Sequence, residues 1–261
     1  MFSLPATIVK AAEHATEAAA HGAHGAEELT GMAAKFEELN HVLGHLTPHV
    51  KFHIGPIPVT STIVNTWIVM VVLTAIVFFI TRKVEYKPRS AGQKILEMYI
   101  EFIGGLLETV MGKKGRKFIP FVGTVFLFIL ALNLSWFIPG MIPPTTDFNT
   151  TFGLSIATIL AVNFIGIREK GLKHYLQHYL EPNPIMAPLT FMEQFTHAFS
   201  LGIRLFGNMF GEKMVVTVLT ILAPLIFPLP VQLLGIIMGI IQAFVFTLLT
   251  ITYISEFVLG H

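Results

Sequence analysis

The sequence has no cysteine and little charge for a chain of 261 residues. Without cysteine, disulfides, thiol nucleophiles and cysteine-ligated metals are excluded. Only 13% of the residues are charged, whereas 53% are hydrophobic and the mean hydropathy is +0.69. A soluble domain of this size normally carries roughly 25% charged residues. The shortage of charge therefore predicts a membrane protein.

An excess of one charge sign is also missing, because the net charge is only +1 at pH 7. This balance gives no electrostatic basis for a nucleic-acid partner. A cleavable signal peptide is not expected either, since the apolar run at residues 4–9 is short and Lys10 follows it.

Residues 1–60 differ in composition from the rest of the chain. This His- and Ala-rich stretch holds seven of the eleven histidines. We interpret it as an external N-terminal segment that is mobile or lies on a surface, with some helix around residues 32–46.

Long apolar runs after residue 60 predict an all-α polytopic membrane protein with five transmembrane crossings. Residues 61–81 form the first transmembrane helix, since about 20 apolar residues cross the hydrocarbon core. Residues 117–170 hold two apolar runs joined by a proline-rich turn, which predicts a membrane hairpin. Residues 185–258 predict a second hairpin, and its length implies tilted helices.

Residues 90–112 show a different pattern. Polar residues recur there three, four or seven positions apart, namely Lys94, Glu97, Glu101 and Glu108. This spacing predicts an amphipathic helix that lies at the membrane interface. A loop helix packed on a neighbour is the alternative interpretation.

The distribution of basic residues predicts the orientation of the chain. Residues 82–117 hold nine Lys or Arg and residues 168–173 hold three, whereas residues 139–147 and 224–230 hold none. The positive-inside rule therefore places the basic loops and the C-terminus in the cytoplasm and the N-terminus outside.

Two basic residues, Arg204 and Lys213, fall inside a predicted crossing, together with Glu193 and Glu212. A charge in the membrane is costly and normally marks a pathway or a partner. At about 100° per residue, six residues of this helix lie along one stripe of its surface. These residues are Glu193, His197, Ser200, Arg204, Asn208 and Gly211.

Arg204 has no carboxylate within reach on its own helix. Glu193 is about 16 Å away along the axis and Glu212 about 12 Å, whereas an intrahelical partner stands three or four residues away. Arginine stays protonated, so Arg204 is a fixed cation whose carboxylate partner must come from elsewhere. The polar groups on each side of it indicate two separate half-pathways for a cation. Glu212 and Lys213 are adjacent, so one of the two could be a charge at the lipid interface.

The last predicted helix places polar and small residues toward its neighbours. Gln242 and Tyr253 are eleven residues apart and share nearly one face, and Gln242 is expected to face either the helix of Arg204 or the pathway. Gly235 and Gly239 are expected to permit close packing.

Several motifs resemble subunit a of bacterial F-type ATP synthases. The run SLGIRLFGNM at residues 200–209 is similar to the family's arginine motif, and IQAFVF at residues 241–246 to its last-helix motif. Shorter matches occur at residues 133–145 and 163–168. The resemblance covers roughly residues 60–257 and leaves the N-terminal segment unexplained.

The resemblance implies a stator in the bacterial plasma (inner) membrane, in contact with lipid, a ring of c subunits and b-type peripheral stalk subunits. Arg204 would face the ring's carboxylate, with Asn208 and Gln242 nearby, between two offset proton half-channels. Glu193 would belong to the cytoplasmic half-channel and Glu212 to the external one. The chain would have no catalytic site, cofactor or metal of its own.

The sequence departs from the family pattern beyond Asn208. Either the family's glutamate is Glu212, one residue closer to the arginine than usual, or Lys213 takes its place. Gly235 stands where some bacterial members carry a histidine partner. The external path would then use Glu212 with water, or other groups such as Asn163.

Three alternatives remain open. Na⁺ is an alternative coupling ion in the same machine. A stand-alone transporter would favour internal repeats, and a His-ligated metal protein would need histidines that face each other inside the membrane.

Overall fold

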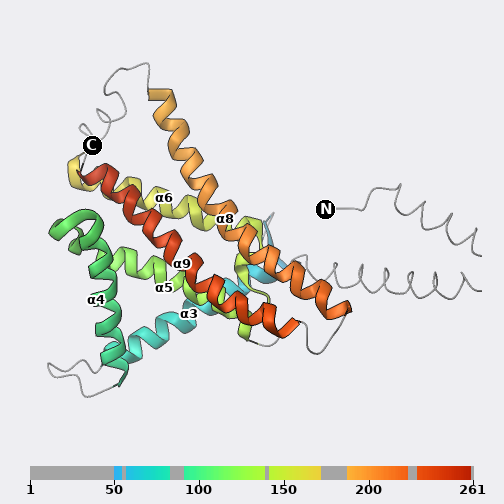
Figure 1. The fold of residues 1–261 in the computed structure, drawn as a ribbon. Coiled ribbons are helices and arrows are strands. Elements are labelled where there is room, and N and C mark those ends of the chain that lie inside the picture. The colour runs from blue at the N-terminus through green and yellow to red at the C-terminus, as the bar shows by residue number, and fades with distance from the viewer. Residues whose placement is uncertain are drawn as a thin grey trace, which may run out of the picture.

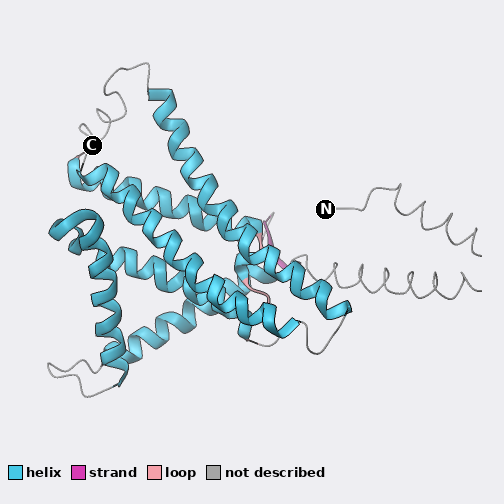
Figure 2. Cartoon of the chain, in the orientation of Figure 1, coloured by secondary structure: helices cyan, strands magenta, loops and turns pink. Residues whose placement is uncertain are grey.

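The computed structural model describes residues 50–54, 57–82, 91–138, 141–171, 187–222 and 228–259. Within these ranges the chain is almost wholly helical, as Figures 1 and 2 show. This confirms the predicted all-α class, with one addition. A short antiparallel pair of strands, β1 (Val50–Ile54) and β2 (Ile57–Thr60), precedes the first helix. The rest of the predicted N-terminal segment lies outside the described residues.

Helix α3 (Ser61–Thr81) carries no charge and exposes most of its apolar side chains. Val71 is 64% exposed and Phe79 is 68% exposed, a surface that suits lipid far better than water. Within the described ranges, four helical stretches are long and apolar enough to cross a membrane: Ser61–Thr81, Ala91–Phe137, Phe148–Lys170 and Pro228–Val258. The multi-pass architecture is thereby confirmed, while a fifth crossing by the charged helix near Arg204 stays a prediction.

Helix α4 (Ala91–Met111) has one buried and one exposed apolar side. Ile103 and Leu107 are fully buried, whereas Ile95 and Met98 are about two-thirds exposed, at 63% and 66%. Figure 1 shows α4 running across the direction of the helices labelled α5 and α6 instead of along it. This orientation agrees with a helix that lies at an interface, which remains a prediction in the absence of a membrane.

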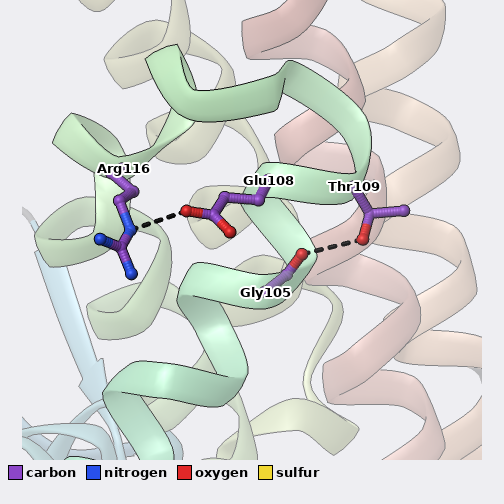
Figure 3. Close-up of polar contacts among 4 residues, drawn as sticks. All are labelled: Gly105, Glu108, Thr109 and Arg116. Carbon is purple, nitrogen blue, oxygen red and sulfur yellow. Dashed lines mark hydrogen bonds and ion pairs between the residues drawn. The ribbon is translucent and has the colours of Figure 1, made fainter.

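Helix α4 ends where Gly112 adopts a left-handed backbone conformation, with φ 64°. The chain then folds back as the 3₁₀ helix η1 (Gly112–Phe118), and Arg116 Nε lies 2.8 Å from Glu108 Oε1 (Figure 3). Helix α5 (Ile119–Leu134) follows directly. Tyr99 Oη donates a hydrogen bond to the carbonyl of Gly123, at 2.5 Å, and so fixes α4 against α5.

Two short 3₁₀ turns, η2 (Ser135–Phe137) and η3 (Pro144–Thr146), connect α5 to α6 (Phe148–Lys170). Asp147 caps the start of α6, because its Oδ1 accepts a hydrogen bond from the backbone N–H of Asn149 at 3.0 Å. The helix stops at Gly171, whose φ of 81° no other residue type adopts easily.

The last two helices, α8 (Ala187–Leu222) and α9 (Pro228–Leu259), contain 36 and 32 residues. At 1.5 Å per residue they are about 54 and 48 Å long, well beyond the ~30 Å of a hydrocarbon core. Figure 1 shows them side by side and oblique to α6. Both properties agree with the long tilted hairpin predicted over residues 185–258.

Helix α9 lies at the centre of the packing, because α5, α6 and α8 each pack against it. Both helices of the hairpin predicted over residues 117–170 thus meet α9. The core at this junction is fully buried and includes Ile129 of α5, Leu205 of α8 and Phe246 of α9.

Helices α6 and α8 are in close contact at Gly202. A Cβ atom at this position would lie 2.9 Å from the ring of Phe152 and 2.9 Å from Ser155 Oγ. A larger residue would force the side chains of Phe152 and Ser155 to shift, so the glycine favours this contact, as expected where small residues let helices approach in a membrane.

Gly202→Val is expected to lower the stability of the chain by about 1–3 kcal/mol, the usual cost of overpacking, and the melting temperature in detergent by several degrees. The matched control is Gly153→Val on α6, where a Cβ meets nothing within 4 Å. Equal melting temperatures for the two variants would contradict the assigned contact.

Candidate functional site

Arg204 lies on α8 at the boundary between a buried and an exposed side of the helix. Its neighbours Leu201 and Leu205 are buried at 1% and 0%, whereas Ile203 is 43% exposed. No hydrogen bond or ion pair joins Arg204 to any other side chain that the structure describes. Its guanidinium does act electrostatically on the phenol of Tyr253 in α9. The described chain therefore holds the cation without supplying a carboxylate for it.

One turn from Arg204, an amide pair connects the two long helices. Asn208 Nδ2 donates a hydrogen bond to Gln242 Oε1 at 2.5 Å. Gln242 is 3% exposed, and its Nε2 is buried without a partner among the described atoms. Gln242 thus faces the helix of Arg204, which is one of the two orientations predicted for it.

A second contact between α8 and α9 lies toward the N-terminal end of α8. The imidazole of His197 stacks on the ring of Tyr253, with centroids 4.2 Å apart and planes 14° from parallel. Glu193 Oε1 lies 3.9 Å from His197 Nε2, so the two form an ion pair only when the imidazole is protonated. Ser200, partly buried, stands between His197 and Arg204 along the helix.

Asn163 lies on α6, whose direction is antiparallel to that of α8. Phe152 of α6 meets Gly202, whereas Leu160 shares an apolar groove with Gln194. Asn163 therefore faces the Glu193 end of α8. This corrects the expectation that Asn163 supplements Glu212, because the antiparallel packing carries it to the opposite side of Arg204.

A third contact between α8 and α9 lies beyond Asn208. The carboxylate of Glu212 fills the space in which a side chain at Gly235 would begin. One turn further along α9, Asn133 Nδ2 of α5 donates a hydrogen bond to the carbonyl of Gly239 at 3.0 Å. Gly235 and Gly239 thus permit close packing as predicted. Any side chain at position 235 would collide with the carboxylate of Glu212.

Lys213, one of the two adjacent charges that could have lain at the lipid interface, is buried instead. It is 6% exposed, and it interacts electrostatically with Asp147. The hundred-degree step between neighbours on a helix separates it from Glu212. Sequence reasoning missed Asp147, although its place just before an apolar helix is typical of an N-cap.

The buried side-chain atoms that lack a partner among the described residues fall on both sides of Arg204. On the Glu193 side they are Asn163 Oδ1 and His197 Nδ1. On the Glu212 side they are Ser61 Oγ, Asn133 Oδ1, Thr145 Oγ1, Thr150 Oγ1 and Glu212 Oε2. Buried polar atoms normally find a partner or an ordered water. The described parts of the chain bring together no three His, Asp or Glu side chains that could hold a metal ion.

Comparison with known proteins gives one consistent result. Residues 63–255 match the family model described as ATP synthase A chain. "ATP synthase subunit a" of Moorella thermoacetica is 54% identical over 217 residues, which cover 83% of this chain and 99% of that protein. "ATP synthase subunit a 2" of Bradyrhizobium sp. is 36% identical, covering 80% and 94%. The protein of the same name from Acaryochloris marina is 37% identical, covering 81% and 92%.

Asn208→Ala and Gln242→Ala are expected to be coupled by about 1 kcal/mol in a double-mutant cycle, because each variant removes the same hydrogen bond. The measurement is thermal unfolding of the purified protein in detergent. Asn208→Ala combined with Thr252→Ala, an exposed position farther along α9, should be additive. Additivity in both pairs would show that the amide contact contributes nothing.

Proposed function

We propose, since this chain belongs to the ATP synthase A chain family, that it leads protons to and from carboxylates on a rotating ring of c subunits. As a member of the family it is a multi-pass membrane subunit of a bacterial ATP synthase and assembles with other subunits of that complex. The observation that carries the finer proposal is Arg204, a cation at the edge of an exposed helix face for which the described chain supplies no carboxylate.

The surface beside Arg204 supports a partner made of apolar helices. We define the ring-facing surface as the exposed residues of α8 and α9 that adjoin Arg204 in sequence or across the hairpin. They are Ile203, Gly207, Asn208, Gly211, Val215, Leu234, Ile237 and Ile241. A Cβ at Gly207 or Gly211 would meet nothing within 4 Å. These glycines are therefore not needed for packing within the described chain, and they leave room for a partner helix.

Electrostatics gives Arg204 its role in this proposal. A protonated carboxylic acid that arrives beside a permanent cation is favoured to lose its proton, because the cation stabilises the carboxylate. The resulting contact breaks when the next carboxyl group replaces it. The same positive charge repels a proton that would cross directly from one side to the other.

The two groups of unpaired polar atoms support two separate half-channels. On one side, Glu193, His197, Asn163 and Tyr253 would carry protons between the ring and bulk water. On the other side, Glu212 would do so beside Gly235, with polar groups of α3, η3 and α6 leading outward. Water can satisfy such atoms and connect them by hydrogen bonds. Asn208 and Gln242 would separate the two half-channels next to Arg204.

The basic residues support an assignment of sides. Arg82 ends α3, Lys113–Lys117 lie in η1, and Arg168 and Lys170 end α6. Lys117 and Glu169 form an ion pair between η1 and α6, which brings these ends together. By the positive-inside rule this side is cytoplasmic, so Glu193 would serve the cytoplasmic half-channel and Glu212 the external one. Family membership also makes b-type peripheral stalk subunits expected partners.

Arg204→Gln is expected to reduce proton-driven ATP synthesis at least about 100-fold, the scale for loss of one preorganised electrostatic group. The assembled complex should still form, because Arg204 makes no hydrogen bond or ion pair within the described chain. The assay is ATP synthesis by purified complex in liposomes after an acid–base jump in Na⁺-free buffer.

Arg168→Gln is the matched control for Arg204→Gln, because Arg168 is exposed at the end of α6, and it should retain most of its activity. Coupled synthesis by the Arg204 variant would refute the proposed mechanism. Wild-type synthesis that appears only after Na⁺ is added would assign Na⁺ as the coupling ion.

Cysteines at Ile203 or Gly207 are expected to crosslink to a cysteine placed beside the c-subunit carboxylate. The natural chain has no cysteine, so the background is clean. Leu160→Cys on α6 is a control that is more exposed than Ile203, at 62% against 43%, and it does not belong to the ring-facing surface. Crosslinking from Leu160 and not from either α8 position would place the ring on another face.

A further inference from the structure

The 3₁₀ helix η1 carries four basic side chains within five residues, and all four are exposed. They are Lys113, Lys114, Arg116 and Lys117. Arg116 is paired with Glu108 of α4, as Figure 3 shows. Lys117 is paired with Glu169 at the end of α6. Lys113 and Lys114 have no hydrogen-bond or ion-pair partner among the residues that the structure describes. Two positive charges of the turn therefore stay uncompensated.

The backbone of η1 is fixed by close packing on α4. Gly115 is buried, and a Cβ there would lie 2.8 Å from the carbonyl oxygen of Leu107. Phe118, which ends η1, is 6% exposed, and Lys117 Nζ lies 5.0 Å from the centroid of its ring. A turn that is already held in one conformation loses little backbone entropy when its side chains bind an anion.

Helix α4 sets these charges beside an exposed apolar surface. Three apolar side chains on it are exposed and lie within about 60° of one another around the helix axis, namely Ile95, Met98 and Phe102. Its exposed acids lie on another side, namely Glu97, Glu101 and Glu108. A helix with one packed, one apolar and one polar side suits the boundary between hydrocarbon and water. Because η1 continues directly from α4, its lysines would lie at the level of the lipid headgroups.

We propose that Lys113 and Lys114 bind the headgroup phosphate of an anionic phospholipid, whose acyl chains lie against the exposed apolar side of α4. Lysine binds phosphate as a point charge, and basic segments beside membrane helices attract anionic lipids. A lipid fits this surface better than an acidic protein segment does, because it supplies hydrocarbon for α4 together with negative charge for η1. The site lies in the leaflet assigned above to the cytoplasm and does not involve Arg204.

The experiment uses complete ATP synthase in phosphatidylcholine liposomes that contain a trace of photoactivatable lipid. One probe is phosphatidylglycerol with a diazirine on its acyl chain, and the other is phosphatidylcholine with the same diazirine. After illumination, mass spectrometry of peptides measures the adducts on residues 105–118. The ratio of the two yields reports the preference for an anionic headgroup, because both probes reach the hydrocarbon equally. It should be about 30, at roughly fivefold for each lysine.

Combined Lys113→Gln and Lys114→Gln should bring this ratio close to one. The diazirine reacts with any nearby group, so the change does not remove its target. Combined Lys113→Arg and Lys114→Arg should keep the preference, because the charge stays. The matched control is combined Arg82→Gln and Lys94→Gln, which removes two exposed charges elsewhere. Lys94 is 19 residues from Lys113, about 28 Å along a helix and beyond the Debye length of ~10 Å at 0.1 M salt. This control should keep the wild-type ratio.

Equal yields from the two probes on residues 105–118 of the wild type would overturn the proposal. So would a ratio that falls equally in the glutamine variant of η1 and in the matched control, since the preference would then reflect overall charge. Adducts that form on the purified chain but not in the complete complex would assign the surface to another subunit and reject the lipid. A preference that disappears only in the glutamine variant of η1 would establish the site.

Discussion

A permanent cation that has no carboxylate partner in the described chain is the constraint around which this structure is organised. Arg204 cannot lose its charge at any accessible pH, and leaving such a charge inside an apolar helix costs several kcal/mol. The fold accepts this cost at the edge of an exposed helix face, where Arg204 is only partly buried. In the proposed complex, a carboxylate of another subunit would neutralise Arg204 and offset this cost.

The antiparallel packing of α8 on α9 determines what surrounds the arginine. Three contacts occur in order along the pair: His197 stacks on Tyr253, Asn208 bonds to Gln242, and Glu212 fills the space at Gly235. As one residue number rises along α8, its partner's number falls along α9. A single helix register thus places an imidazole, an amide and a carboxylate at successive levels, with Arg204 between the first two.

Glycines serve two different purposes in this arrangement. At Gly202 and Gly235, side chains of the same subunit occupy the space where a Cβ atom would stand. At Gly202 they are Phe152 and Ser155 of α6, and at Gly235 it is the carboxylate of Glu212. Gly207 and Gly211 have open space where a Cβ would stand. The first pair sets how closely the helices of this subunit pack. The second pair leaves open space beside Arg204, as the proposed approach of another helix requires.

The sequence by itself determined the membrane class, the apolar segments, the stripe that carries Arg204 and the helix face that carries Gln242. These follow from local periodicity, since residues three or four positions apart share a helix face whatever the fold. The family motif likewise lies within continuous stretches of chain. Tertiary structure alone decided that Asn163 lies on the Glu193 side and that Asp147 and Lys213 are both buried. Those outcomes depend on how α3, α6 and α8 pack, and residues separated by 66 positions, as Asp147 and Lys213 are, leave no periodic signal that connects them.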